Sequence, residues 1–182
     1  MSDPATALDR VRPLLRTRQV REFTDQPLTD DELGALADVA RWTGSAGNSQ
    51  PWRFVVIRDV DVLRRLAEAG VPQTRLLRTA TAAIAIVLTS SDRDLVDAYD
   101  DGRVAERLLV GAGMLGLAAG IGWIRNDVRP AVGEVLGLPE DRYVRTIVAL
   151  GHPTEAAQRP KSAPGEARLP RQAVVFEDRW PG

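Results

Sequence analysis

The chain has 182 residues, of which 44% are hydrophobic and 27% charged, so it can form one ordinary folded domain and is not disordered by composition. Its 24 basic and 25 acidic residues leave a net charge of −1, which argues against a general binder of nucleic acids or anionic membranes, because both need surplus positive charge. The absence of cysteine and the single histidine, His152, exclude thiol nucleophiles, disulfides, cysteine-ligated zinc and multi-histidine metal sites.

The first quarter of the chain predicts two helices. Apolar residues at helical spacing indicate one helix over residues 5–16. A second begins at an N-cap formed by Thr29 or Asp30 and runs to about Trp42. Because no charged start followed by an apolar stretch opens the chain, we expect no secretory signal and a cytoplasmic protein.

The next segment predicts a loop, two strands and the helices between them. A glycine-rich polar loop at 43–50 leads into a β-branched strand at 53–58. A short helix at 60–69 and a helical turn at 74–78 precede a strand at 82–88. The last strand is almost continuously apolar, which predicts burial on both faces.

The following half begins with an acidic stretch. Residues 92–102 are polar and acidic and indicate a surface excursion. A long helix is expected at 103–119, where small residues predict close packing against another helix, in the same chain or in a second copy. Strands at 122–124 and 144–150 and a helix at 130–136 complete the core.

An uncharged stretch and a C-terminal tail without a core pattern are the two unusual parts of this half. Residues 108–124 carry no charge and reach the lower length limit for a membrane span, but five glycines and few bulky apolar groups favour a buried helix. From Pro153 onward no core pattern is found until a short strand-like run at 173–176, so this tail is either disordered or docked on a neighbour.

Alternating strands and helices, with too few strands for a barrel, indicate an α/β or mixed α+β layer sandwich.

Three polar features interrupt the apolar plan. Arg18 and Arg21 follow a helix end at a spacing that lets them converge on one anion, with a solvated surface run as the alternative. Two glycines in the loop 44–50 let main-chain N–H groups approach a planar or anionic ligand, although neither a Walker loop nor GxGxxG is present and a plain turn is the alternative. Arg168 lies in the Pro-rich tail, where solvent exposure is the ordinary interpretation.

Together these motifs resemble the flavin-dependent nitroreductase family. The family's basic RRSxRxF-like segment corresponds to residues 17–23, and its PSSxNxQPW loop corresponds to residues 44–52. The weaker matches, which fall in the right order, are PxxxELxxLLxxA at residues 27–40, LGL at 115–117, LGLP at 136–139, ALGHP at 149–153 and RLP at 168–170. The resemblance covers nearly the whole chain.

The resemblance implies an α+β fold, a three-layer α/β/α sandwich with a mixed, mainly antiparallel sheet, assembled as a domain-swapped homodimer. Residues 1–152 would form the FMN-binding domain, and residues 153–182 a C-terminal extension that wraps the partner subunit. Two FMN molecules would lie at the interface, and neither a nucleic acid, a membrane nor a metal is implied.

The resemblance also implies which residues hold FMN. Arg18, Gln19 and Arg21 would face the phosphate and the N1–O2 edge of the flavin. The other positions carried over are Ser45, Ala46, Gly47, Asn48 and Gln50 from the partner's loop, Gln73 and Arg75 near the pyrimidine ring, the main chain at Ile124, Arg125 and Asn126, and Arg168 at the phosphate.

The implied activity is a ping-pong reduction. NADH or NADPH would deliver hydride to flavin N5, and a nitroaromatic, quinone or similar small acceptor would then take the electrons from the same face. Neither a cysteine nor a well-placed histidine offers an acid, so no side chain is expected to be catalytic and flavin N5 performs the chemistry. A positive Arg21 beside N1–O2 would stabilise the anionic reduced flavin.

Other functions stay open. A specialised family reaction such as dehalogenation is less favoured, because the stretch 90–102 is short for a substrate lid. Thr17, Gln19 and Glu166 depart from the residues common in the family, which motivates a nitroreductase-fold protein with weakened FMN binding that acts as a flavin-binding or interaction protein. A deazaflavin in place of FMN is a further alternative.

Overall fold

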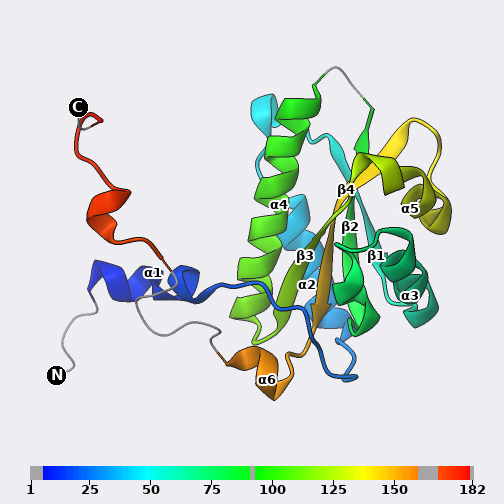
Figure 1. The fold of residues 1–182 in the computed structure, drawn as a ribbon, viewed down its shortest axis with the longest axis horizontal. Coiled ribbons are helices and arrows are strands. Elements are labelled where there is room, and N and C mark those ends of the chain that lie inside the picture. The colour runs from blue at the N-terminus through cyan, green and yellow to red at the C-terminus, as the bar shows by residue number, and fades with distance from the viewer. Residues whose placement is uncertain (1–5, 91–92, 160–167, 181–182) are drawn as a thin grey trace.

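A four-stranded sheet with helices on both faces forms the body of the molecule in the computed structural model, which describes residues 6–90, 93–159 and 168–180 (Figure 1). The strands lie in the order β1 (Trp52–Ile57), β2 (Ala82–Thr89), β4 (Arg142–Gly151) and β3 (Ala118–Trp123), and all three pairings are antiparallel. The α+β class is therefore confirmed, while the mixed sheet that the resemblance implied is antiparallel throughout the described strands.

The helices divide between the two faces and give the three expected layers. One face is covered by α2 (Asp30–Arg41) and α4 (Asp94–Met114), and the other by α3 (Val60–Ala69) and α5 (Arg129–Leu136). Two further helices lie outside these layers, α1 (Ala7–Arg16) and the short α6 (Glu155–Gln158). Figure 1 shows α1 and the described C-terminal segment projecting away from the sandwich.

Local sequence signals explain most of these elements. Every residue of β2 from Ala82 to Leu88 is buried, as its continuous apolar character predicted. A capping box starts α2, where the Thr29 N–H donates to Glu32 Oε2 at 2.7 Å and the Glu32 N–H donates to Thr29 Oγ1 at 3.2 Å. Gly137, with φ +64°, ends α5 in the left-handed conformation that favours glycine.

The acidic stretch at 92–102 is the largest error of the sequence-based prediction. It is not a surface excursion, because α4 begins at Asp94, and Asp97, Asp100 and Asp101 are all buried; residues 91–92 lie outside the described part. These carboxylates lie on the same helix face as the apolar residues that follow them, at spacings of three and four. Buried carboxylates need hydrogen-bond partners. The Asp100 carboxylate accepts a hydrogen bond from the Ala46 N–H, and the Asp101 carboxylate accepts one from the Thr146 hydroxyl.

The expected helix at 103–119 also ends elsewhere. Helix α4 stops at Met114, Gly116 turns the chain with φ +74°, and the strand β3 already begins at Ala118. The close packing predicted for this helix is confirmed, because a Cβ on Gly111 would lie 3.3 Å from Leu36 Cδ2 of α2. Within the described residues, no helix combines the length and the apolar character that crossing a membrane requires.

Both ends of the chain differ in part from expectation. Helix α1 is confirmed from Ala7, but its apolar stripe is 43–66% exposed rather than covered by the rest of the chain. The run at 173–176 is not a strand: a 3-10 turn covers Arg171–Ala173, and nothing in the described tail pairs with the sheet. The departure at Glu166 lies outside the described residues.

Replacing Gly34 with Ala is expected to stabilise the protein by roughly 0.5 to 1 kcal/mol, because glycine inside a helix is less favourable than alanine by about this amount. Gly34 is an exposed residue within α2, and a Cβ there would meet no atom within 4 Å. Urea unfolding of the two proteins measures the difference, and an unchanged or lower midpoint would contradict it.

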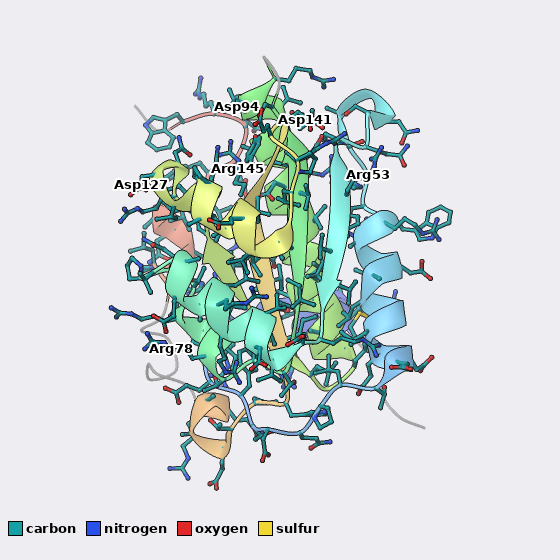
Figure 2. The ribbon with its side chains drawn as sticks, turned by 90° about the vertical axis from the view of Figure 1, so that its right-hand side faces the viewer. Arg53, Arg78, Asp94, Asp127, Asp141 and Arg145 are labelled. Carbon is teal, nitrogen blue, oxygen red and sulfur yellow. The ribbon has the colours of Figure 1, made fainter. Side chains whose placement is uncertain are left out.

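Asp101 makes stability depend on pH. Burial raises the pKa of its carboxyl from 3.8 to about 6, against the opposing effects of the Thr146 hydroxyl, which donates to Oδ2 at 2.7 Å, and of the Arg145 and Arg129 guanidiniums. Figure 2 shows Arg145 at the same end of the sheet as Asp94, which accepts a hydrogen bond from the Tyr143 hydroxyl at 3.1 Å. The folded state therefore holds the Asp101 proton more tightly than the unfolded state.

This proton stabilises the folded state below a pH of about 4, and its contribution is lost as the pH rises through about 6. Between about pH 5 and about pH 8 the loss should be on the order of 1 kcal/mol. The Asp101→Asn variant lacks the titrating group, so its free energy of unfolding should fall less over this range than that of the wild type. Equal pH slopes in urea titrations would contradict the assignment.

Candidate functional site

The basic segment at 17–23 lies against the end of the sheet. The Val20 N–H donates to Ala119 O at 2.8 Å, and the side chains of Val20 and Phe23 are buried. Two glycines make room for it: a Cβ on Gly120 would lie 2.1 Å from Val20 O, and one on Gly151 would lie 2.8 Å from Phe23 Cβ. This close contact fixes the positions of the polar residues between Val20 and Phe23.

The two arginines of this segment have different surroundings. The Arg18 guanidinium donates to Ala157 O and Arg159 O, both at 2.9 Å, and to Gln158 O, so it satisfies carbonyls at the end of α6. Arg21 is exposed and has no hydrogen-bond or ion-pair partner in the described part of the chain. Both residues line a hollow of about 430 Å³, together with Gln19.

Two glutamines lie near the edge strand β3, and one of them, Gln19, lines this hollow. Gln19 Oε1 accepts a hydrogen bond from the Ile121 N–H at 3.3 Å. Gln73 lies near the next residue of the strand, because its main-chain oxygen is 3.4 Å from where a Cβ on Gly122 would lie. The side-chain oxygen of Gln73 is buried without a partner among the described residues, so it is an acceptor that a bound donor can satisfy.

The polar loop has an unusual backbone. A 3-10 turn covers Ala46–Asn48, and φ is positive at Gly47 (+59°), Asn48 (+53°) and Gln50 (+47°). The Gln50 N–H donates to Ser45 Oγ at 2.8 Å, and the Ala46 N–H donates to Asp100 Oδ2 at 2.9 Å. The bond from the Ala46 N–H to Asp100 attaches the loop to α4.

The expectation that main-chain N–H groups of this loop are offered to a ligand is therefore only partly met. Besides those of Ala46 and Gln50, the N–H groups of Asn48 and Ser49 donate to carbonyls inside the loop. Backbone donors that are already satisfied do not attract an anion. A planar ligand can instead meet the exposed backbone at Gly47 and the exposed Asn48 side chain.

The loop and the basic segment lie at opposite ends of α4. The loop is bonded to Asp100, whereas Arg16 and Thr17 line a hollow with Gly113, thirteen residues further along the helix. At 1.5 Å per residue this separation is roughly 20 Å. Figure 1 shows α1 and the segment after it at the lower end of α4. A ring that contacts both sets of residues has to take them from different chains.

The other predicted positions are scattered. Arg75 is exposed at the start of the 3-10 turn Arg75–Arg78, and Arg168 is exposed in the tail. At the end of β3, Ile124 is fully buried and the Arg125 Nε–H donates to Asp127 Oδ1 at 2.9 Å. Asn126 lines a separate hollow with residues of α5. The structure therefore brings Gln19 and Arg21 together in one hollow and places the Gln73 main chain beside the same edge strand, whereas Asn126 lines a different hollow.

Sequence reasoning missed Asp100 and Arg103, which contact the loop from α4. The Arg103 Nη1–H donates to Asp100 Oδ1 at 3.0 Å. The signal was available, since Asp100 falls on the helical period of the buried Val104 and Leu108. Within the described residues, no group of acidic and histidine side chains is placed to hold a metal ion.

Known proteins that resemble this chain agree on one family. The sequence profile of the nitroreductase family matches residues 14–75, which include both the basic segment and the loop. A protein of Archaeoglobus fulgidus, assigned provisionally as an NADH dehydrogenase/NAD(P)H nitroreductase, is 32% identical over 76% of this chain and 82% of its own length. The NADPH-flavin oxidoreductase of Vibrio harveyi is 28% identical over 93% of this chain and 74% of its own.

Solved structures show the same fold. An FMN-dependent nitroreductase from Clostridium difficile superimposes with a TM-score of 0.77, covering 92% of this chain and 99% of the other at 22% identity. At that identity the likeness supports the fold alone.

Proposed function

The chain belongs to the nitroreductase family, and on this basis we propose that it is an NAD(P)H-dependent FMN oxidoreductase that reduces nitroaromatics, quinones or similar small acceptors. The observation that carries the proposal is the placement of an exposed arginine, an unpartnered buried amide oxygen and a left-handed polar loop within the family's matching segment. The relatives named as nitroreductase and flavin oxidoreductase support the reaction.

The residues at the end of the sheet fit FMN. Arg21 offers an exposed guanidinium in the hollow, suited to a phosphate or to the N1–O2 edge. The orphaned Gln73 Oε1 suits a donor such as the imide N–H of a flavin's pyrimidine ring. Arg18 and Gln19 complete the set in the same hollow, and the partner's loop would cover the ring through Ser45, Ala46, Gly47, Asn48 and Gln50.

FMN, when bound, supplies hydride acceptance and release at N5. The contribution of the chain is binding and electrostatics. A positive Arg21 near N1–O2 would stabilise negative charge there, in a position fixed by the Val20 contact to β3. Arg18 would act mainly through structure, because its donors already hold α6. We assign no side chain as a general acid.

We also propose that the protein is a homodimer with the site at its interface, working in the cytoplasm where NADH and NADPH are regenerated. The exposed apolar residues of α1 and of the end of α4 support this assembly. Pro13, Leu14, Val110 and Met114 line a hollow of about 510 Å³ between these helices. Residues 153–182 would wrap the partner, which accounts for the exposed aromatic pair Phe176 and Trp180.

Titration of the purified apoprotein with FMN tests the proposal. Quenching of flavin fluorescence should saturate at one FMN per chain. Light scattering should give twice the mass of one chain. Reduction of a nitroaromatic or quinone by NADH or NADPH should follow ping-pong kinetics. If the protein is a monomer and is colourless once excess FMN has been removed, both the enzyme and the dimer are refuted.

One observation favours a second candidate, a flavin-binding or interaction protein with weakened FMN affinity. Arg18 is committed to the α6 carbonyls and Gln19 to the Ile121 N–H, which leaves Arg21 as the arginine of the segment that has no hydrogen-bond or ion-pair partner among the described residues. The same titration separates the candidates, since this one predicts weak, reversible FMN binding without turnover. A specialised reaction is less supported, because residues 94–102 form turns of α4 rather than a lid.

A further inference from the structure

We propose that Asp100 is a positioning residue that holds the loop 44–50 in its FMN-binding conformation, an inference that rests on the proposed function. Its side chain is completely buried on α4. Oδ2 accepts a hydrogen bond from the Ala46 N–H at 2.9 Å, and Oδ1 accepts one from Arg103 Nη1 at 3.0 Å. One carboxylate thus joins the start of the loop to the helix.

Two arginines of α4 extend this attachment. Arg103 Nη2 lies 3.0 Å from where a Cβ on Gly44 would be, so the guanidinium fills the space beside that glycine. The Arg107 Nη1–H donates to Trp42 O at 3.2 Å, just before the loop begins. Asp100, Arg103 and Arg107 are three and four residues apart, which places them along one edge of the helix.

The loop needs such an attachment because its own backbone is unfavourable. Asn48 and Gln50 have φ values of +53° and +47°, a region that residues other than glycine seldom adopt. Fixing the main chain at Ala46 restricts the alternatives open to the following residues. Losing this contact would lower the fraction of chains whose loop is ready to bind, and the apparent dissociation constant rises by the inverse of that fraction.

The experiment compares Asp100→Ala and Asp100→Asn with Glu106→Gln, which removes one negative charge from an exposed position on the same helix. Two quantities are measured on each apoprotein: hydrogen exchange at the Ala46 amide by NMR, and the dissociation constant for FMN by fluorescence quenching. In Asp100→Ala both should rise: exchange at Ala46 toward the rate of an unprotected amide, and the dissociation constant by about ten- to a hundredfold, the range expected for a hydrogen bond to a buried charge.

The other variants sharpen the comparison. Asp100→Asn keeps an oxygen that can accept from the Ala46 N–H, so both quantities should rise less than in Asp100→Ala. Glu106→Gln should change neither quantity.

Unchanged exchange at Ala46 in Asp100→Ala would overturn the inference, as would an FMN dissociation constant that rises without faster exchange. If Asp100→Ala does not fold, Asp100→Asn decides by the same two readouts. Should the wild type not bind FMN, the proposed function fails, whereas exchange at Ala46 still decides whether Asp100 holds the loop.

Discussion

Replacing Arg21 with Ala is expected to weaken FMN binding by roughly ten- to a hundredfold, because hydrogen bonds to charged groups contribute about 1.5 to 3 kcal/mol. Arg21 is exposed in the hollow that also contains Gln19, and it has no partner in the described part of the chain. Its removal therefore breaks no hydrogen bond or ion pair there. The dissociation constant is measured by fluorescence quenching, with thermal unfolding of the apoprotein as a check on stability.

Two further variants separate charge from geometry at this position. Arg21→Lys keeps the positive charge but loses the planar fork, so it should recover only part of the affinity. Arg65→Ala removes an exposed arginine from α3 and should leave FMN binding unchanged. Arg18→Ala is a poorer test, because the carbonyls at the end of α6 would lose their donor. Equal FMN affinity in Arg21→Ala and wild type would remove Arg21 from the proposed site.

Local signals were sufficient to predict most of the fold. Helix α3 was predicted with its observed bounds, and the start of α2 followed from an N-cap at Thr29 or Asp30, of which the structure shows Thr29. The prediction failed at α4, where acidic residues suggested solvent. Asp100 and Asp101 are buried with hydrogen bonds from Ala46 and Thr146. These partners lie 54 and 45 residues away in sequence. The helical period of Asp100 with Val104 and Leu108 indicates a buried position, but a local pattern does not identify a hydrogen-bond partner so far away in the sequence.

The site was predictable in part for the same reason. The spacing of Arg18 and Arg21 indicated a basic segment, but not that Arg18 would satisfy carbonyls 139 to 141 residues further along the chain. Likewise, the glycines marked the loop, while the buried carboxylate that receives the Ala46 N–H lies on another element. A site divided between the two ends of a helix becomes apparent only when the helix is in place.

Replacing Gly120 with Ala is expected to destabilise the protein by about 3 kcal/mol, at the upper end of the usual range for overpacking. The added Cβ would lie 2.1 Å from Val20 O and 2.7 Å from Leu76 Cδ1. The main chain at Val20 cannot turn aside as a side chain can, so the segment has to move away from β3 and lose its 2.8 Å bond to Ala119 O. Thermal unfolding should show a midpoint lower by roughly 6 to 12 °C.

The same substitution should also weaken FMN binding, because the displaced segment carries Gln19 and Arg21. Gly122→Ala, two residues along the strand, is the matched control: its Cβ would approach the flexible tip of Leu76 at 3.3 Å, and a stability loss below about 1 kcal/mol is expected. If Gly120→Ala lowers stability while FMN affinity at a permissive temperature stays at the wild-type value, the contact with β3 supports only the fold, and the position of the basic segment does not determine cofactor binding.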